Sequence, residues 1–193
     1  VNTWWTVKRN HGKTDLSKIY GIEVQQEVAE MAQRSVKLNN LENRFEIINK
    51  NIKDLESVFD KNSFDFIITN PPYKKMDTGK TNENSKKLIS RHEITATLKD
   101  FIKISYIMLK DKGTLYMVHK PERLVDIIYQ LRKNKIEPKE IRFVHPYEKK
   151  EPNLILIKAV KNGGQFLKID KPLYVYNERG EYTEEILKIY NKM

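Results

Sequence analysis

The chain contains no cysteine among its 193 residues, which excludes disulfides, thiolate metal sites and a cysteine nucleophile. No apolar run approaches the roughly 20 residues that a membrane-spanning helix needs. The first residues lack the basic and apolar segments of a secretory signal peptide. These absences favour a cytoplasmic protein, with no membrane partner and no metal site, and they do not indicate an oligomeric state.

Positive charge is the most prominent feature of the composition. The 36 Lys and Arg residues outnumber 26 Asp and Glu residues, which gives a net charge of +10, and they are spread along the whole chain. A folded basic domain attracts phosphate polymers because binding releases their counterions. The charge therefore favours a nucleic-acid partner, although solubility and a lysine-biased genome would produce the same composition.

Strand and helix patterns alternate along the chain. Strands are expected at 18–24, 45–48, 64–69, 114–119, 141–144 and 153–160, and helices at 25–38, 93–109, 121–133 and 183–190. This alternation predicts an α/β fold with a mostly parallel sheet. The last two strands lie too close together for a helix between them and should form an antiparallel pair. The polar segment 74–90 is expected to be a long mobile loop.

Two polar groups follow expected strands, at the edge where open α/β sheets bind their ligands. Glu23 ends the strand Ile19-Tyr20-Gly21-Ile22. A carboxylate in this place can accept hydrogen bonds from both hydroxyls of a ribose. A solvated acid at a strand end is the alternative interpretation.

The second group is Asn70-Pro71-Pro72-Tyr73, directly after the apolar strand 64–69. The prolines fix φ near −65° and remove two backbone donors, so the Pro71 carbonyl faces outward without a local N–H as competitor. The Asn70 side-chain oxygen adds a second acceptor, and Tyr73 can cover a planar group by stacking. Two rigid acceptors suit an NH2 group with two donors, while a simple strand-terminating turn is the alternative.

The expected chemistry follows from the electronics of such an NH2 group. Its lone pair is delocalised, which makes it a poor nucleophile. Accepting both N–H protons in hydrogen bonds pushes electron density toward the nitrogen. Holding that nitrogen in line with an activated methyl group then promotes transfer, mainly by positioning and electrostatics.

The Asn-Pro-Pro-Tyr sequence matches the NPPY motif of S-adenosylmethionine-dependent amino methyltransferases. DNA adenine and release-factor glutamine methyltransferases share this motif, but further blocks of the chain resemble the tRNA1(Val) adenine-37 N6-methyltransferase family. They are Tyr20-Gly21-Ile22-Glu23-Val24, Asn82-Glu83-Asn84 leading to Arg91-His92-Glu93, Met117-Val118-His119-Lys120-Pro121-Glu122-Arg123-Leu124, Phe143-Val144-His145-Pro146 and Lys150-Glu151-Pro152-Asn153-Leu154. The resemblance runs from about Lys18 to the C-terminus and implies a Rossmann-like methyltransferase fold.

The resemblance also implies roles for individual residues. The cofactor-binding residues would be Asp15, Glu23, Asn51 and Asn70, with Glu23 on the ribose and Asn51 near the cofactor adenine or in a local turn. The target base would be held at Asn70, Pro71, Pro72 and Tyr73. Lys74, Lys75, Arg91, His92, Lys120 and Arg123 would contact RNA, with ordinary surface roles as the alternative for the last four.

One expected feature of this family is missing. A glycine-rich loop close to D-L-G-x-G-x-G should follow the first strand, because only glycine lets the backbone approach the cofactor. Here Asp15-Leu16 is followed at once by Ser17-Lys18. Either stretches of a longer protein are absent from this sequence, or the protein is truncated or altered. The sequence as it stands predicts weak or absent cofactor binding.

The sequence is therefore interpreted as a single methyltransferase domain with an incomplete N-terminal part. Residues 1–17 form an atypical head, 18–161 the core and 162–193 a C-terminal extension. The predicted function is N6-methylation of an adenine in tRNA, at adenine 37 of a valine tRNA by family likeness. The alternatives are a protein-glutamine or DNA-adenine N-methyltransferase, and an inactive RNA-binding domain of the same fold.

Overall fold

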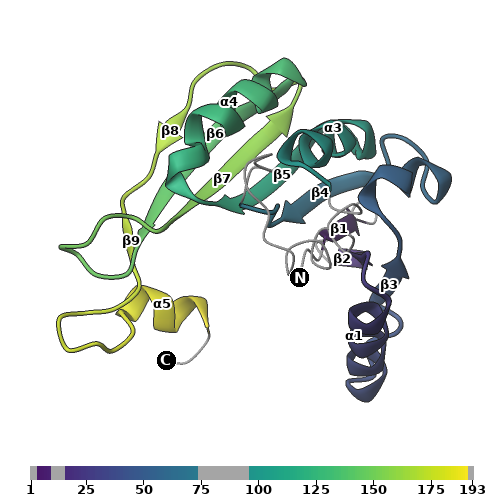
Figure 1. Cartoon of the computed structure of the whole chain (residues 1–193), viewed down its shortest axis with the longest axis horizontal. Helices are drawn as coiled ribbons and strands as arrows, with labels where there is room; N and C mark the ends of the chain where they lie inside the picture. Colours follow the sequence, from purple (N-terminus) through teal and green to yellow (C-terminus); the bar gives the residue numbers. More distant parts are fainter. Residues whose placement is uncertain (1–3, 10–15, 74–95, 191–193) are drawn as a thin grey trace, which may run out of the picture.

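The computed structural model of the chain describes residues 4–9, 16–73 and 96–190. One mixed sheet runs through the molecule, and helices α3 (Leu98–Met108) and α4 (Leu124–Lys133) lie over the same face of it (Figure 1). Helix α1 (Gln26–Leu38) packs beside the far end of the sheet. This arrangement is the α/β architecture that the alternating pattern predicts.

The strands adopt the order β3-β2-β1-β4-β5-β7-β6-β8. The strands of this path are β1 (Trp4–Arg9), β2 (Leu16–Glu23), β3 (Phe45–Asn49), β4 (Phe64–Thr69), β5 (Leu109–His119), β6 (Ile136–His145), β7 (Leu154–Lys161) and β8 (Lys168–Ile169). Strands β2, β3, β4, β5 and β6 run in one direction, whereas β1 and β7 run against their neighbours. The antiparallel pairing of β6 with β7 confirms the expectation for the last two long strands.

Strand β1 is the main departure from the predicted elements. The sequence pattern assigns no strand to residues 4–9, yet β1 lies between β2 and β4 and is antiparallel to both. Its pairs put Trp4 opposite Ile22 and Trp5 opposite Ile68, so β1 starts at the edge where β2 and β4 end. Strand β1 fills the space between β2 and β4, but its own carboxyl end lies at the opposite edge of the sheet.

Three element boundaries also differ from the prediction, each for a local reason. Helix α3 begins at Leu98 rather than 93, because Thr97 and Asp100 form a capping box there. Strand β5 begins at Leu109 rather than 114 and so includes residues 111–113, where Lys112 has a φ of 58° and the pairing with β4 shifts register. Strand β6 begins at Ile136 and contains Pro138, which is tolerated because the pairing with β7 is irregular at that point.

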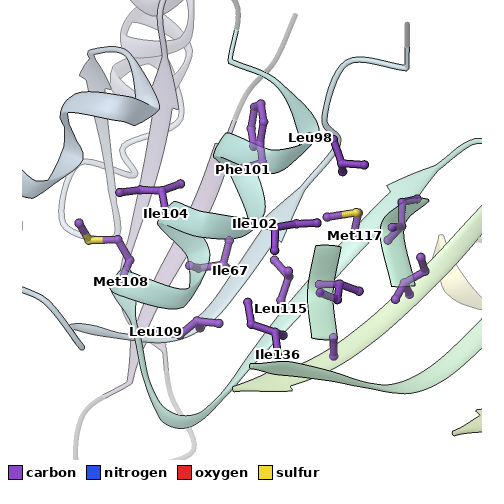
Figure 2. Packing of buried hydrophobic residues seen from close by; sticks show 14 of the residues in the cluster. Ile67, Leu98, Phe101, Ile102, Ile104, Met108, Leu109, Leu115, Met117 and Ile136 are labelled. Atoms are coloured by element: carbon purple, nitrogen blue, oxygen red, sulfur yellow. The ribbon is translucent and has the colours of Figure 1, made fainter. Parts of the chain in front are cut away.

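The described residues also form two 3₁₀ helices, η1 (Ile52–Ser57) and η2 (Pro121–Arg123). The core lies between the sheet and helices α3 and α4. In Figure 2, Ile102 of α3 lies beside Leu115 and Met117 of β5, and Ile67 of β4 belongs to the same cluster. Ile67, Ile102, Met108 and Leu115 are fully buried. Burial of such side chains contributes about 1.5–3 kcal/mol each and fixes the ends of β4 and β5 in relation to each other.

The C-terminal part of the chain packs against the end of β6. Strand β9 (Leu173–Tyr174) pairs with Val144 and His145, and helix α5 (Glu184–Ile189) places Ile186 against Val144 and Leu173. Arg142 of β6 joins this packing through an ion pair with Glu185 at 2.7 Å. Strands β8 and β9 therefore extend the sheet beside β6.

The sheet face opposite α3 and α4 carries exposed apolar side chains. Ile68 is 46% exposed and Tyr116 is 37% exposed, and a hollow of about 270 Å³ lies over Tyr116, Arg142 and Lys158. The alternation of side chains along β4 and β5 directs these residues away from the core that Ile67 and Leu115 enter. No helix in the described ranges has both the length and the apolar character needed to cross a membrane.

Gly113 allows the close approach of β5 to β4, and its replacement should destabilise the fold. A Cβ at Gly113 would lie 2.9 Å from the Lys110 carbonyl oxygen and 3.2 Å from the Phe64 carbonyl oxygen, and backbone cannot easily move aside. We expect Gly113→Ala to lower the free energy of unfolding by about 1–2 kcal/mol in urea denaturation. Gly164→Ala is the matched control, because its Cβ would meet no atom within 4 Å. Equal stability of the two variants would contradict this explanation.

Candidate functional site

The polar groups singled out in the sequence meet at one edge of the sheet. Strands β2, β4 and β5 are parallel to one another, so Glu23, Asn70 and His119 all lie at or just beyond carboxyl ends on that edge. The start of β1 separates the end of β2 from the end of β4. Open α/β sheets bind ligands at this edge, which makes it the candidate site.

Glu23 is held firmly at the end of β2. The residue is 1% exposed, and its Oε1 accepts the Gln25 backbone N–H at 2.9 Å, directly before helix α1. Its backbone carbonyl accepts the Asn49 side-chain amide at 2.8 Å, which ties the ends of β2 and β3 together. The carboxylate is therefore fixed in direction, and its contact with a ribose stays a prediction.

Asn51 serves as the N-cap of η1. Its Oδ1 accepts the Lys53 backbone N–H at 3.1 Å, two residues beyond the end of β3. This geometry matches the local turn role that was one of the two interpretations of Asn51. The residue nevertheless lies near Glu23 at the correct edge, so its contact with a cofactor stays a prediction.

The NPPY motif leaves β4 as the sequence pattern predicts. Thr69 ends the strand and is buried, Asn70 is exposed, and Pro71 is buried. Pro72 and Tyr73 are half-buried. An exposed Asn70 beside a fixed Pro71 can offer its side-chain oxygen to an incoming group without losing core packing.

The end of β5 and the turn η2 support the motif from one side. Arg123 Nη1 donates to the Tyr73 carbonyl oxygen at 3.2 Å, while its Nε donates to Asp126 Oδ2 at 2.8 Å. The His119 ring meets the Tyr73 ring edge-on, with 5.1 Å between the ring centroids. The Lys120 ammonium lies 5.6 Å from the centroid of the same Tyr73 ring. Tyr73 is therefore fixed in place through both its carbonyl and its ring.

These contacts change the interpretation of two residues that were predicted to contact RNA. Arg123 has only 15% of its side chain exposed and is bound to Tyr73 and Asp126, so its geometry favours support of the motif. Lys120 is half-buried over Tyr73, and its contact with RNA stays a prediction. The other residues predicted to contact RNA, Lys74, Lys75, Arg91 and His92, lie outside the described residues, as does Asp15, which was predicted to bind the cofactor.

His119 is the residue of this site to which the sequence interpretation assigned no role. It is fully buried, and its Nδ1 accepts the Lys120 backbone N–H at 2.8 Å. Burial lowers the pKa of His119, and the positive charge of Arg123 lowers it further. One sequence signal could have revealed the residue, because His119 ends a buried strand at the ligand-binding edge just as Glu23 does.

The lowered pKa of His119 predicts a loss of stability in acid. Between its folded-state pKa and the ordinary value of about 6.5, the unfolded chain binds a proton that the folded chain does not. The free energy of unfolding should therefore fall as the pH drops below about 6.5. Urea denaturation of the wild type and His119→Gln across this range measures the effect. The wild type should have the steeper dependence, and parallel curves would contradict the assignment.

Comparison with known proteins places the chain among methylases. The family model described as Eco57I restriction-modification methylase matches residues 17–151. The chain is also 27% identical, over 142 residues, to the tRNA1(Val) (adenine(37)-N6)-methyltransferase of Porphyromonas gingivalis strain ATCC 33277. The protein of that name from strain W83 is 26% identical. Each match covers 72% of this chain and 55% of the relative, so the chain spans about half the length of the curated relatives it matches.

Solved structures confirm the fold. A predicted O-methyltransferase from Agrobacterium tumefaciens, protein Atu636, superimposes with a TM-score of 0.70 at 20% identity, over 89% of this chain and 76% of that one. A SAM-dependent methyltransferase from Aquifex aeolicus gives a TM-score of 0.51 at 18% identity, over 75% of this chain and 69% of that one. The Rossmann-like methyltransferase sheet predicted from the sequence is thus confirmed, and with the family match over 17–151 the chain belongs to the Eco57I restriction-modification methylase family.

Proposed function

We propose that this chain carries the catalytic part of an S-adenosylmethionine-dependent methyltransferase that modifies the N6 amino group of an adenine in tRNA. The observation that carries the proposal is the placement of Asn70 and Pro71 at the carboxyl end of β4, with Tyr73 held behind them by Arg123. The names of the Porphyromonas gingivalis relatives support adenine 37 of tRNA1(Val) as the target.

The residues of the motif would act by orientation. The Asn70 oxygen and the Pro71 carbonyl oxygen would accept the two N6 protons of the base, which raises electron density on the nitrogen and fixes its direction. The base has to be unstacked to reach them, as bases in a single-stranded loop are. After the methyl group has been transferred, the N6 nitrogen loses a proton to solvent, so the chain requires no strong base.

The described residues fit one end of the methyl donor. The fixed carboxylate of Glu23 suits the ribose hydroxyls, and the bound donor would supply an activated methyl group. The methionine end of the donor requires a backbone turn that approaches it closely. In the described part of the chain, however, the start of β1 lies between the ends of β2 and β4. The chain therefore fits the donor only in part, and we expect weak affinity for it.

DNA adenine is the second candidate substrate, because the family description refers to restriction-modification methylases. The net charge of +10 suits either nucleic acid and argues against a protein glutamine. The names of the relatives favour tRNA over DNA.

Transfer of labelled methyl groups distinguishes these substrates. The purified chain is incubated with methyl-labelled S-adenosylmethionine at millimolar concentration and with total tRNA, duplex DNA or a protein extract in parallel. We expect label on tRNA and none on duplex DNA. Label on DNA alone would favour the second candidate. Binding of tRNA without transfer of label would favour an inactive RNA-binding domain.

A further inference from the structure

His119 stands out because one of its nitrogens lacks a hydrogen bond in the interior of the protein. The residue is 0% exposed, and its Nε2 has no partner of normal geometry within the described part of the chain. Buried polar side-chain atoms in native proteins nearly always have a partner, so an exception beside a candidate active site calls for an explanation.

The tautomer of His119 follows from its other nitrogen. Nδ1 accepts the backbone N–H of Lys120 at 2.8 Å, so a neutral ring has to carry its proton on Nε2. The ring is kept neutral near pH 7 by burial and by the charge of Arg123. Nε2 is therefore a buried donor in need of an acceptor.

A suitable acceptor belongs to the NPPY motif. The backbone of Pro72 lies close enough to act on the His119 ring as a hydrogen-bond partner, and Pro72 directly precedes Tyr73, whose ring contacts His119. The edge-on contact between the rings of His119 and Tyr73 keeps the imidazole beside the Pro72 backbone. Because Nε2 is buried, a substrate in the site does not reach it, so the donor acts on the protein itself.

We propose that His119 is a positioning residue, whose Nε2–H holds the Pro72 carbonyl and thereby aims the acceptors of Asn70 and Pro71 at the target amino group. Arg123 performs the same task one residue further on, at the Tyr73 carbonyl. Two donors from the end of β5 and from η2 thus hold two consecutive carbonyls of the motif. This inference rests on the proposed function, since it concerns the aim of the same acceptors.

Two substitutions separate hydrogen bonding from packing. The amide of Gln reaches as far along the side chain as Nε2 and can still donate to Pro72, whereas the amide of Asn reaches only as far as Nδ1. We expect His119→Asn to lower kcat on tRNA by about tenfold to a hundredfold with little change in KM, because misplaced acceptors slow transfer. His119→Gln should retain kcat within about threefold of the wild type.

His145→Asn is the matched control. His145 ends β6 at the same edge, and its Nδ1 bonds to the Lys150 carbonyl oxygen at 2.7 Å, in contact with Tyr174 rather than with the motif. This variant should keep the wild-type kcat. A wild-type kcat in His119→Asn, or equal losses in His119→Asn and His119→Gln, would overturn the inference.

A measurement without turnover separates this inference from the proposed function. Long-range 1H–15N spectra of the wild type show which ring nitrogen of each histidine carries the proton, and the chain has only four histidines. The signal that is lost in His119→Asn should be a neutral ring protonated at Nε2. A proton on Nδ1 would overturn the inference. If the wild type transfers no methyl group to any nucleic acid, the proposed function fails, and the spectrum still decides the role of His119.

Discussion

Asn70→Ala should reduce methyl transfer to tRNA by about a hundredfold or more in kcat, because it removes one of two positioned acceptors. Asn70 is exposed and lies outside the buried core, so the substitution should change the free energy of unfolding by no more than about 0.5 kcal/mol. Single-turnover transfer of labelled methyl groups at saturating tRNA measures the loss. Circular dichroism and urea denaturation check that the variant is folded.

Asn70→Asp is the informative companion of this variant. It keeps an oxygen acceptor at the same position and replaces the side-chain NH2 by a second oxygen that carries negative charge, so it should retain more activity than Asn70→Ala. Normal turnover in Asn70→Ala would remove the role assigned to this residue. Equal losses in the two variants would show that the amide contributes more than an acceptor.

Lys161→Met should lower the free energy of unfolding by about 3 kcal/mol, because it leaves three acceptors without their donor, and the bond to the Leu109 carbonyl oxygen is buried. Lys161 is 5% exposed, and its ammonium donates to Asn62 Oδ1 at 2.6 Å and to the carbonyl oxygens of Tyr106 and Leu109 at 2.6 and 2.8 Å. The same ammonium lies 4.3 Å from the centroid of the Tyr106 ring. This one side chain joins the end of α3, the start of β5 and the loop before β4.

Lys158→Met provides the control on the same strand. Lys158 forms a partly exposed ion pair with Glu140 at 3.1 Å, so its replacement should change stability by less than about 1 kcal/mol. Urea denaturation of both variants at neutral pH compares the two sites. A loss of less than 1 kcal/mol in Lys161→Met would show that Lys161 does not hold these elements together.

The comparison of these two lysines shows what a sequence pattern can predict. Strand β7 alternates buried and partly exposed residues, and this period of two places Lys161 on the buried side with Ile155, Ile157 and Ala159. The burial of Lys161 is thus readable in the sequence. Its acceptors are not, because two are backbone carbonyls at the end of a helix and the third belongs to a distant loop.

In the candidate site, too, some residues could be predicted from the sequence and others could not. Glu23 and Asn70 could be predicted because each directly follows a buried strand, and parallel strands bring their carboxyl ends to one edge. The support from His119 and Arg123 could not, because it depends on how η2 turns back toward Tyr73. The direction of β1 was equally hidden, because the sequence pattern assigns no strand to residues 4–9.

Nucleoside analysis of the product tests the central claim most directly. Unmodified tRNA1(Val) is incubated with the wild-type chain and S-adenosylmethionine, digested to nucleosides, and analysed by mass spectrometry against an N6-methyladenosine standard. The account predicts N6-methyladenosine in the wild-type reaction and its loss with Asn70→Ala. Methylation at any other position of the base, or an equal yield of N6-methyladenosine with Asn70→Ala, would contradict the account.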